Sequence, residues 1–197
     1  MPTQIPLEPG NGGRSVLSDV LQSGDIILST TPNFGSEAIR AITSGGPASH
    51  VRLYVGTDVI GTPAVIEAVP DGGVRVADLI TDLQGDTVAV AFRFPNITLG
   101  AQDSVKAFAQ QQLGQSYNFF GIVQQALFRL LPAVDLIVNL GTPDNQTFFC
   151  SQLVIAAYDS AGTPLTLTPP AFQSPNDIVP LQWFGELDYI GHLKFQP

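Results

Sequence analysis

The sequence predicts an α+β fold in which an antiparallel sheet packs against helices. Apolar and polar residues alternate along several segments between residues 50 and 94, a period of two that is typical of strands. Apolar residues later follow helical spacing at 105–113 and again at 147–160. Hydrophobic residues make up 44% of the 197 positions, which is enough for one well-packed interior. We therefore expect residues 15–197 to form a single domain after a flexible tail at 1–14, where proline and glycine are frequent.

One strand and two helices are expected before residue 50. A short helix fits residues 15–22. The apolar run Ile26–Leu28 is short enough to be a buried strand. A second helix is expected from Ser36, which can cap it, to Thr43, because Gly45–Pro47 then ends it.

Four strands are expected in the middle of the chain. The expected strands span residues 50–56, 64–69, 73–77 and 87–94, and the turn Asp71–Gly73 joins the second to the third. The period of two is clearest in the first of them. We expect the four strands to form an antiparallel meander.

Helices are expected again in the second half. The first has its apolar face within 105–113 and ends at Gly114. The second runs from about Asn118 to Leu131. The third spans 147–160 and has Thr147 as its N-cap. A final strand is expected within 181–195.

Composition restricts the partners and the location. Eight basic and 17 acidic residues give a net charge of −9, which repels phosphate backbones at long range, so we expect no nucleic-acid partner. The first ten residues lack the basic and apolar regions of a secretory signal. We therefore expect the protein in the cytoplasm, or exported by a non-classical or dedicated secretion system. The apolar segment 119–140 contains Arg129, Pro132 and Asp135, which makes it a poor membrane span.

Cys150 is the candidate nucleophile. It is the only cysteine, so no internal disulfide can form. In the first turn of the expected helix, its thiol would face unpaired backbone N–H groups and the positive end of the helix dipole, and both favour the thiolate. The alternative is a small buried side chain without chemistry, because Phe148, Phe149 and Leu153 lie close in the sequence.

His50 is the candidate base. It begins a strand directly after the loop at 45–49, and loops at the ends of strands are where catalytic residues are often found. A neutral imidazole within hydrogen-bond reach of Cys150 would take the thiol proton, and the imidazolium would then stabilise the thiolate. The alternative is a histidine with no catalytic role.

Glu67 is the candidate for orienting His50. It interrupts an apolar strand, and a buried carboxylate is costly unless a partner compensates it. If the first two of the four expected strands form a hairpin, His50 and Glu67 share a face, opposite each other or one diagonal step apart. The alternatives are that Glu67 points to solvent or pairs with Arg52 or Arg75.

Other kinds of site are not indicated. The second histidine, His192, is most simply an edge-strand residue, and neither an HExxH nor a CxxC pattern occurs, so we expect no metal and no other cofactor. The G-x-S-x-G elbow of serine hydrolases and the phosphate-binding loop G-x-x-x-x-G-K-[ST] are both missing from the sequence.

Five short segments, taken in order, resemble those of circularly permuted NlpC-type, papain-like amidases. They are Gly24–Leu28, Ser49–Gly56, Ile66–Ala68, Gly114–Tyr117 and Phe149–Tyr158. The order histidine, glutamate, cysteine is that of the permuted branch, whereas the cysteine precedes the histidine in ordinary NlpC-type peptidases. The resemblance implies a permuted papain-like fold with the nucleophile at a helix N-terminus.

The resemblance also implies a cysteine hydrolase. Cys150 would attack an acyl carbonyl, His50 would transfer the proton, and Glu67 would fix the histidine tautomer. Tyr117 matches a tyrosine that would bind the oxyanion together with the Cys150 backbone N–H, and its alternative role is packing. The implied substrate is an amide or peptide bond, most plausibly in the peptide stem of bacterial peptidoglycan.

The long segment between Tyr117 and Cys150 departs from the resemblance. It includes the apolar residues 119–140, which could form a lid, a substrate wall or a surface that contacts lipid. Two alternatives therefore stay open: a lipid-directed thiol hydrolase or acyltransferase, and a non-catalytic binding module. A peptidoglycan amidase without a secretory signal would be an antibacterial effector, a phage-associated enzyme or a wall-recycling enzyme, and the sequence names no immunity or delivery partner.

Overall fold

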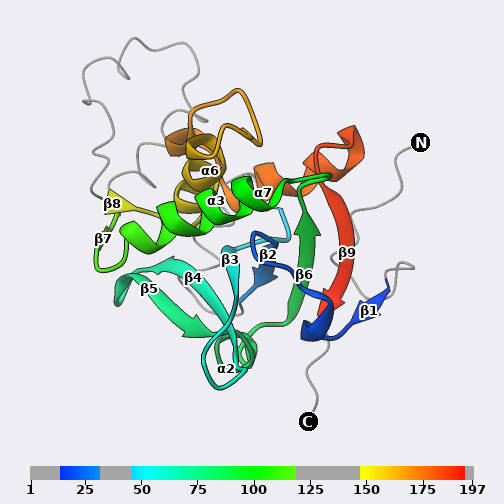
Figure 1. Ribbon diagram of the computed structural model, residues 1–197, viewed down its shortest axis with the longest axis vertical. Coiled ribbons are helices and arrows are strands. Elements are labelled where there is room, and N and C mark those ends of the chain that lie inside the picture. Colours follow the sequence, from blue (N-terminus) through cyan, green and yellow to red (C-terminus); the bar gives the residue numbers. More distant parts are fainter. Residues whose placement is uncertain (1–13, 32–45, 119–146, 194–197) are drawn as a thin grey trace.

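The computed structural model describes residues 14–31, 46–118 and 147–193, and its main feature is a seven-stranded sheet (Figure 1). The strands are β1 (Ser15–Val16), β2 (Ile26–Thr30), β3 (His50–Thr57), β4 (Pro63–Val69), β5 (Gly73–Asp78), β6 (Val88–Arg93) and β9 (Asp188–Leu193). The described α-helices are α2 (Leu79–Leu83), α3 (Leu99–Gln111), α6 (Cys150–Ser160) and α7 (Pro175–Ile178). The strand order is β1-β9-β6-β2-β3-β4-β5, and every pairing is antiparallel except that of β1 with β9. The predicted α+β class is confirmed.

The four strands expected between residues 50 and 94 are all present, but they do not form one meander. β3, β4 and β5 follow one another in the sheet, next to β2. β6 instead pairs with the other side of β2, where Phe92 lies opposite Ile26. The chain reaches that side through α2, a helix that the sequence did not predict and that Asp78 caps by accepting from the Thr81 N–H. The expected meander is therefore wrong for its last strand.

Two clusters of buried side chains lie on opposite faces of the sheet. On one face, α3 and α6 pack on side chains that include Leu53 and Ile66. On the other face, α2 packs on side chains that include Tyr54 and Val65. Figure 1 shows α3 and α6 on one side of the sheet and α2 on the other. Alternation along β3 and β4 thus assigns each side chain to one of two layers.

A second, two-stranded parallel sheet leads into α6. It pairs β7 (Ser116–Tyr117) with β8 (Thr147–Phe148). Gly73, at the start of β5, has a φ of +64°, and a Cβ there would lie 2.1 Å from the carbonyl oxygen of Gln115. Only glycine therefore allows β5 to approach the residue before β7 this closely.

Two predicted element boundaries are corrected by the pairing of strands. The helix expected from Thr147 begins at Cys150, because the two residues of β8 pair with β7 instead. The helix expected over residues 15–22 is replaced by β1 and by a 3-10 helix at Ser18–Val20, since Ser15 pairs with His192 in β9. In both cases a partner distant in sequence overrides the local preference.

The final strand expected within 181–195 is present as β9. Of the segment 181–195, the first residues belong to a 3-10 helix at Val179–Phe184, and β9 follows. His192 was expected on an edge strand, but β9 lies between β1 and β6. That expectation is wrong because β1, not β9, forms the edge.

Several expectations lie outside the described residues. They concern the tail up to Gly13, the helix at 36–43, the helix from Asn118 to Leu131 and the role of 119–140. The division into a tail and one domain stays a prediction. In the described part of the chain, no helix combines the length and apolar character needed to cross a bilayer.

Candidate active site

Cys150 is the first residue of α6. Phe149 precedes it as the N-cap in an extended conformation, and no side chain caps the helix there. The first backbone N–H groups of a helix have no partners within the helix, and together they give this end a partial positive charge. Cys150 is only 3% exposed, so its thiol lies at the positive helix end and in contact with the buried core.

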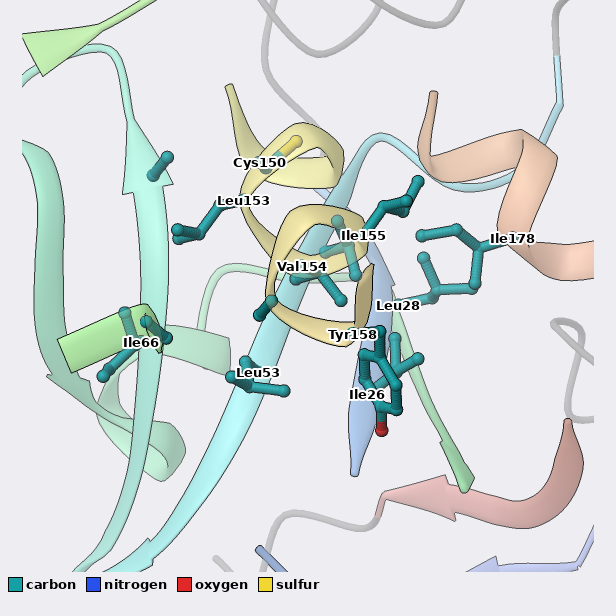
Figure 2. Close-up of a cluster of buried hydrophobic side chains, with 14 of the residues drawn as sticks. Ile26, Leu28, Leu53, Ile66, Cys150, Leu153, Val154, Ile155, Tyr158 and Ile178 are labelled. Carbon is teal, nitrogen blue, oxygen red and sulfur yellow. The ribbon is translucent and has the colours of Figure 1, made fainter. Parts of the chain in front are cut away.

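The first turn of α6 is anchored on two sides. The Ser151 hydroxyl donates a 2.6 Å hydrogen bond to the carbonyl oxygen of Gln173, and both groups are buried. On the other side, the Asn118 side-chain amide donates to Gln152 Oε1 at 3.3 Å. Figure 2 shows Cys150 at the end of α6 and, further along the helix, the apolar side chains that pack on the sheet. These contacts fix the position of the thiol relative to β3.

The loop at residues 46–49 holds the start of β3. Asn176, in α7, accepts a 2.9 Å hydrogen bond from the Ala48 N–H, and the Ser49 N–H donates to the Ser29 carbonyl at 2.9 Å. A Cβ at Gly46 would lie 2.2 Å from the Asn176 side-chain oxygen, so any larger residue there would displace the Asn176 amide. The loop therefore delivers His50 in a defined position.

His50 contacts both other predicted site residues. Its Nε2 lies 2.7 Å from Glu67 Oε2, and the Cys150 side chain lies near enough to raise the pKa of His50. Alternation puts His50 and Glu67 on the face covered by α2, whereas α6 covers the opposite face. His50 is the first residue of β3, so it lies at the edge of both layers.

Glu67 pairs with two arginines as well as with His50. It is fully buried, and Arg75 directly opposite in β5 lies 2.7 Å from its Oε1. Arg52 lies 3.3 Å from Oε2. The alternatives of a histidine or an arginine partner are therefore not exclusive, and the side chain does not face solvent.

The pKa values of His50 and Glu67 are both shifted in the direction that favours the ionised form. Burial and the charge of Arg52 lower the pKa of His50, but hydrogen bonds to Cys150 and Glu67 and the Cys150 charge outweigh them and raise it from 6.5 to about 9. Burial raises the pKa of Glu67, but its contacts with His50 and the two arginines lower it from 4.5 to about 2. A protonated His50 and an ionised Glu67 are thus the favoured pair at neutral pH.

Tyr117 lies beside the strand that leads to Cys150, whereas His192 has a different setting. Burial and the charge of Cys150 raise the pKa of Tyr117, which is 9% exposed in β7. His192 Nδ1 lies 2.7 Å from the Tyr189 hydroxyl oxygen. Within the described ranges, no group of three or more histidine, cysteine or acidic side chains is arranged to hold a metal.

Sequence reasoning missed the acidic residues that surround the arginines. Asp82 in α2 and Asp86 after it both contact Arg52, and α2 itself was not predicted. The sequence did indicate the position of Arg52, because it lies two residues after His50 in the same strand and therefore on the same face. Which oxygen of Glu67 each donor contacts could not be inferred without the three-dimensional arrangement.

Comparison with known proteins places this chain in a family. The family described as "Permuted papain-like amidase enzyme, YaeF/YiiX, C92 family" matches residues 20–128. "Probable lipoprotein peptidase YaeF" of Escherichia coli (strain K12) is 26% identical over 212 residues, which cover 92% of this chain and 74% of that protein. The crystal structure of a protein described as metalloprotein yiiX, from Escherichia coli O157:H7, has a TM-score of 0.59 and 19% identity, covering 86% of this chain and 96% of that chain. This likeness shows the fold.

The resemblance noted in the sequence was correct for the permuted papain-like architecture but named a different family. The match covers more than half of the chain and is to the C92 family, which is not the NlpC-type family. The enzyme class favours a catalytic protein over a binding module. The chain belongs to the permuted papain-like amidase family C92, of the YaeF/YiiX type, and is a cysteine amidase or peptidase.

Proposed function

We propose that this protein hydrolyses an amide or peptide bond with Cys150 as nucleophile, His50 as proton carrier and Glu67 as the group that orients His50. One observation carries the proposal: the buried carboxylate of Glu67 contacts Nε2 of His50 at 2.7 Å, and the thiol at the start of α6 lies near enough to raise the pKa of the same histidine. Because Glu67 occupies Nε2, Nδ1 is the ring nitrogen left for the thiol. Each group then has one defined role.

The reaction follows from these positions. His50 holds the proton that the Cys150 thiol gives up, and the thiolate attacks the substrate carbonyl carbon. The tetrahedral intermediate collapses, the carbon–nitrogen bond breaks, and the leaving amine takes the proton from His50. Water then attacks the thioester while His50 accepts its proton, and the carboxylic acid and the free thiol are released.

The N-terminus of α6 supports stabilisation of the oxyanion. The Cys150 backbone N–H lies at the positive helix end, where a developing negative charge is favoured. Tyr117 is the proposed second donor, because it pairs with Phe148 in the two-stranded sheet that leads into α6 and the Cys150 charge contributes to the raised pKa of its hydroxyl. A Tyr117→Phe variant keeps the ring and removes only this donor.

For the substrate, we propose the peptide stem of peptidoglycan. The family description names an amidase and the YaeF relative is named a peptidase, which favours an amide over an ester. The net charge of −9 gives no long-range attraction to anionic lipid surfaces. In this proposal the enzyme acts on a bacterial wall, either as an antibacterial effector or in wall turnover. Action on lipid through residues 119–140 is the competing outcome of the test.

Product analysis tests the proposal. The protein is incubated separately with purified peptidoglycan and with phospholipid vesicles, and products are identified by mass spectrometry. We expect peptide-stem fragments with the wild type and none with Cys150→Ala or His50→Gln. The control is His192→Gln, which removes the other histidine, in β9, and should keep activity. Fragments released by Cys150→Ala would refute the nucleophile, and Cys150-dependent release of fatty acid with intact peptidoglycan would replace the wall substrate with lipid.

A further inference from the structure

Three cationic side chains share the two oxygens of Glu67. Arg75 takes Oε1, with its Nε donating at 2.8 Å and a terminal nitrogen at 2.7 Å. Oε2 faces His50 Nε2 at 2.7 Å and Arg52 Nε at 3.3 Å. Arg52 therefore competes with His50 for the same oxygen. The longer distance shows that His50 has the stronger contact with it.

Neighbouring groups keep Arg52 from capturing Glu67. Its Nε donates to Asp82 Oδ2 at 2.5 Å. A terminal nitrogen donates to Ser29 Oγ at 2.6 Å and to Asp86 Oδ2 at 3.0 Å. Arg52 is only 4% exposed, so these three acceptors satisfy most of its donors inside the protein. They hold the guanidinium slightly beyond Oε2.

Asp82 connects the two arginines. Its Oδ2 binds Arg52, and its Oδ1 accepts from an Arg75 terminal nitrogen at 3.1 Å. Strand pairing places Arg75 beside Glu67, because Glu67 in β4 lies directly opposite Arg75 in β5. Asp82 is in α2, which packs on this face of the sheet. One carboxylate thus holds one arginine against Glu67 and the other arginine away from it.

We propose that Arg75 and Asp82 are positioning residues, which keep Oε2 of Glu67 directed at His50 and deny it to Arg52. The proposal deepens the proposed function and rests on it. The charge balance of the cluster agrees with this role. Glu67, Asp82 and Asp86 carry three negative charges against two on Arg52 and Arg75, and a protonated His50 supplies the balancing charge. Without Arg75, Glu67 is free to turn both oxygens toward Arg52.

The test is a titration of His50 by NMR in the wild type and in Arg75→Gln. His50 is one of two histidines, and His192→Gln identifies its signals. If Glu67 turns away, the pKa of His50 should fall from about 9 by about one unit or more. Alkylation of Cys150 by iodoacetamide at pH 8.5 should slow by about threefold, because a one-unit fall lowers the protonated fraction of His50 from about three-quarters to about one-quarter. Arg75→Lys should restore part of both, and Asp82→Asn should act in the same direction as Arg75→Gln.

Arg93→Gln is the matched control for a purely structural role. Arg93 makes a similar two-point pair with Asp25, with both bonds at 2.7 Å, beside the far end of β2. The Arg93→Gln variant should have a lower melting temperature and an unchanged pKa of His50. The proposal is overturned if Arg75→Gln behaves like Arg93→Gln. A rise in the pKa of His50 in Arg75→Gln would also overturn it, because the loss of a positive charge by itself raises that pKa. A wild-type His50 that already titrates near 6.5 would overturn it as well.

The two proposals fail in different ways. The NMR titration reports on the contact between Glu67 and His50 whether or not any substrate is cleaved. If the titration of His50 changes in Arg75→Gln but no substrate is cleaved, the positioning role stands and the hydrolase is refuted. Products that require Cys150, combined with an unchanged titration in Arg75→Gln, would refute only the positioning.

Discussion

His50 joins two layers that the fold builds separately. Its strand parity assigns it to the face of α2 and the arginines, yet the thiol that α6 brings from the opposite face lies near enough to raise its pKa. The position at the start of β3 makes this possible, since a residue further along the strand would be confined to one face. The site is therefore sensitive to the packing of both layers.

At the residue scale, the pair of His50 and Glu67 predicts a window of maximum stability. The pKa of His50 is raised from 6.5 to about 9, so its contribution is complete below 6.5 and is lost as the pH rises through 9. The pKa of Glu67 is lowered from 4.5 to about 2, so its contribution is present above 4.5 and is lost as the pH falls through 2. The pair stabilises most between pH 4.5 and 6.5.

Urea unfolding from pH 5 to 10 measures this. The free energy of unfolding of the wild type should fall by on the order of 2–3 kcal/mol between pH 6 and pH 10 through His50 alone. The His50→Gln variant should lack that part of the decline. Parallel curves for the two proteins would contradict the raised pKa of His50.

Individual site residues were predictable where one residue broke a pattern. Glu67 was found because a carboxylate interrupts an apolar strand, and Cys150 because it lies near a helix start. Asp82 and Asp86 follow β5 in a segment with no such contrast, so nothing in the local sequence marks them. Their importance comes from the strand pairing that brings Arg52 and Arg75 to the same place.

At the scale of elements, α6 depends on a buried hydrogen bond near its N-terminus. We expect Ser151→Ala to cost about 1–3 kcal/mol in the free energy of unfolding, because the buried carbonyl of Gln173 loses its donor. The matched control is Ser160→Ala at the other end of the same helix, where an exposed serine donates to the Ala157 carbonyl. Its cost should stay within about 0.5 kcal/mol.

Urea unfolding at one pH distinguishes the two serine variants. Because Ser151 lies next to Cys150, its removal should also slow alkylation of the thiol, whereas the Ser160 variant should react like the wild type. Equal losses of stability in the two variants would show that the Gln173 contact does not hold the helix start.

Elements with strong local patterns were predictable, and those that depend on distant partners were not. β3, β4 and α3 follow clear periods of two or of helical spacing. β1 has only two residues, and its pairing with β9 cannot be read from either segment alone. The neighbours of β6 were missed for the same reason, since the alternation that predicts a strand does not say which strand lies beside it.

At the scale of the whole molecule, the two outer parts of the described chain meet. The Arg14 carbonyl accepts a 2.8 Å hydrogen bond from the His192 N–H, and β1 runs parallel to β9. A circular permutant that joins residue 197 to residue 1 and opens the exposed turn between Asp71 and Gly72 should therefore fold, since cuts in exposed turns are tolerated. In it the cysteine precedes the histidine.

Circular dichroism and Cys150 alkylation test the permutant. We expect the same spectrum, a lower melting temperature and an alkylation rate within about threefold of the wild type, because loop closure costs little. A second permutant opened between Ala89 and Val90, inside β6 at the centre of the sheet, should not fold. A folded protein with an unreactive thiol would show that chain order itself shapes the site.

The placement of α6 late in the chain also has a consequence for biosynthesis. A ribosome delivers His50, Glu67 and the arginine-bearing strands first, and the α6 side of the sheet lacks its covering helix until residues 150–160 emerge. The acid–base half of the site is thus translated long before its nucleophile. A nascent chain shorter than this can neither complete the layer that α3 begins on that face nor carry a thiol, so reactivity cannot precede the synthesis of α6.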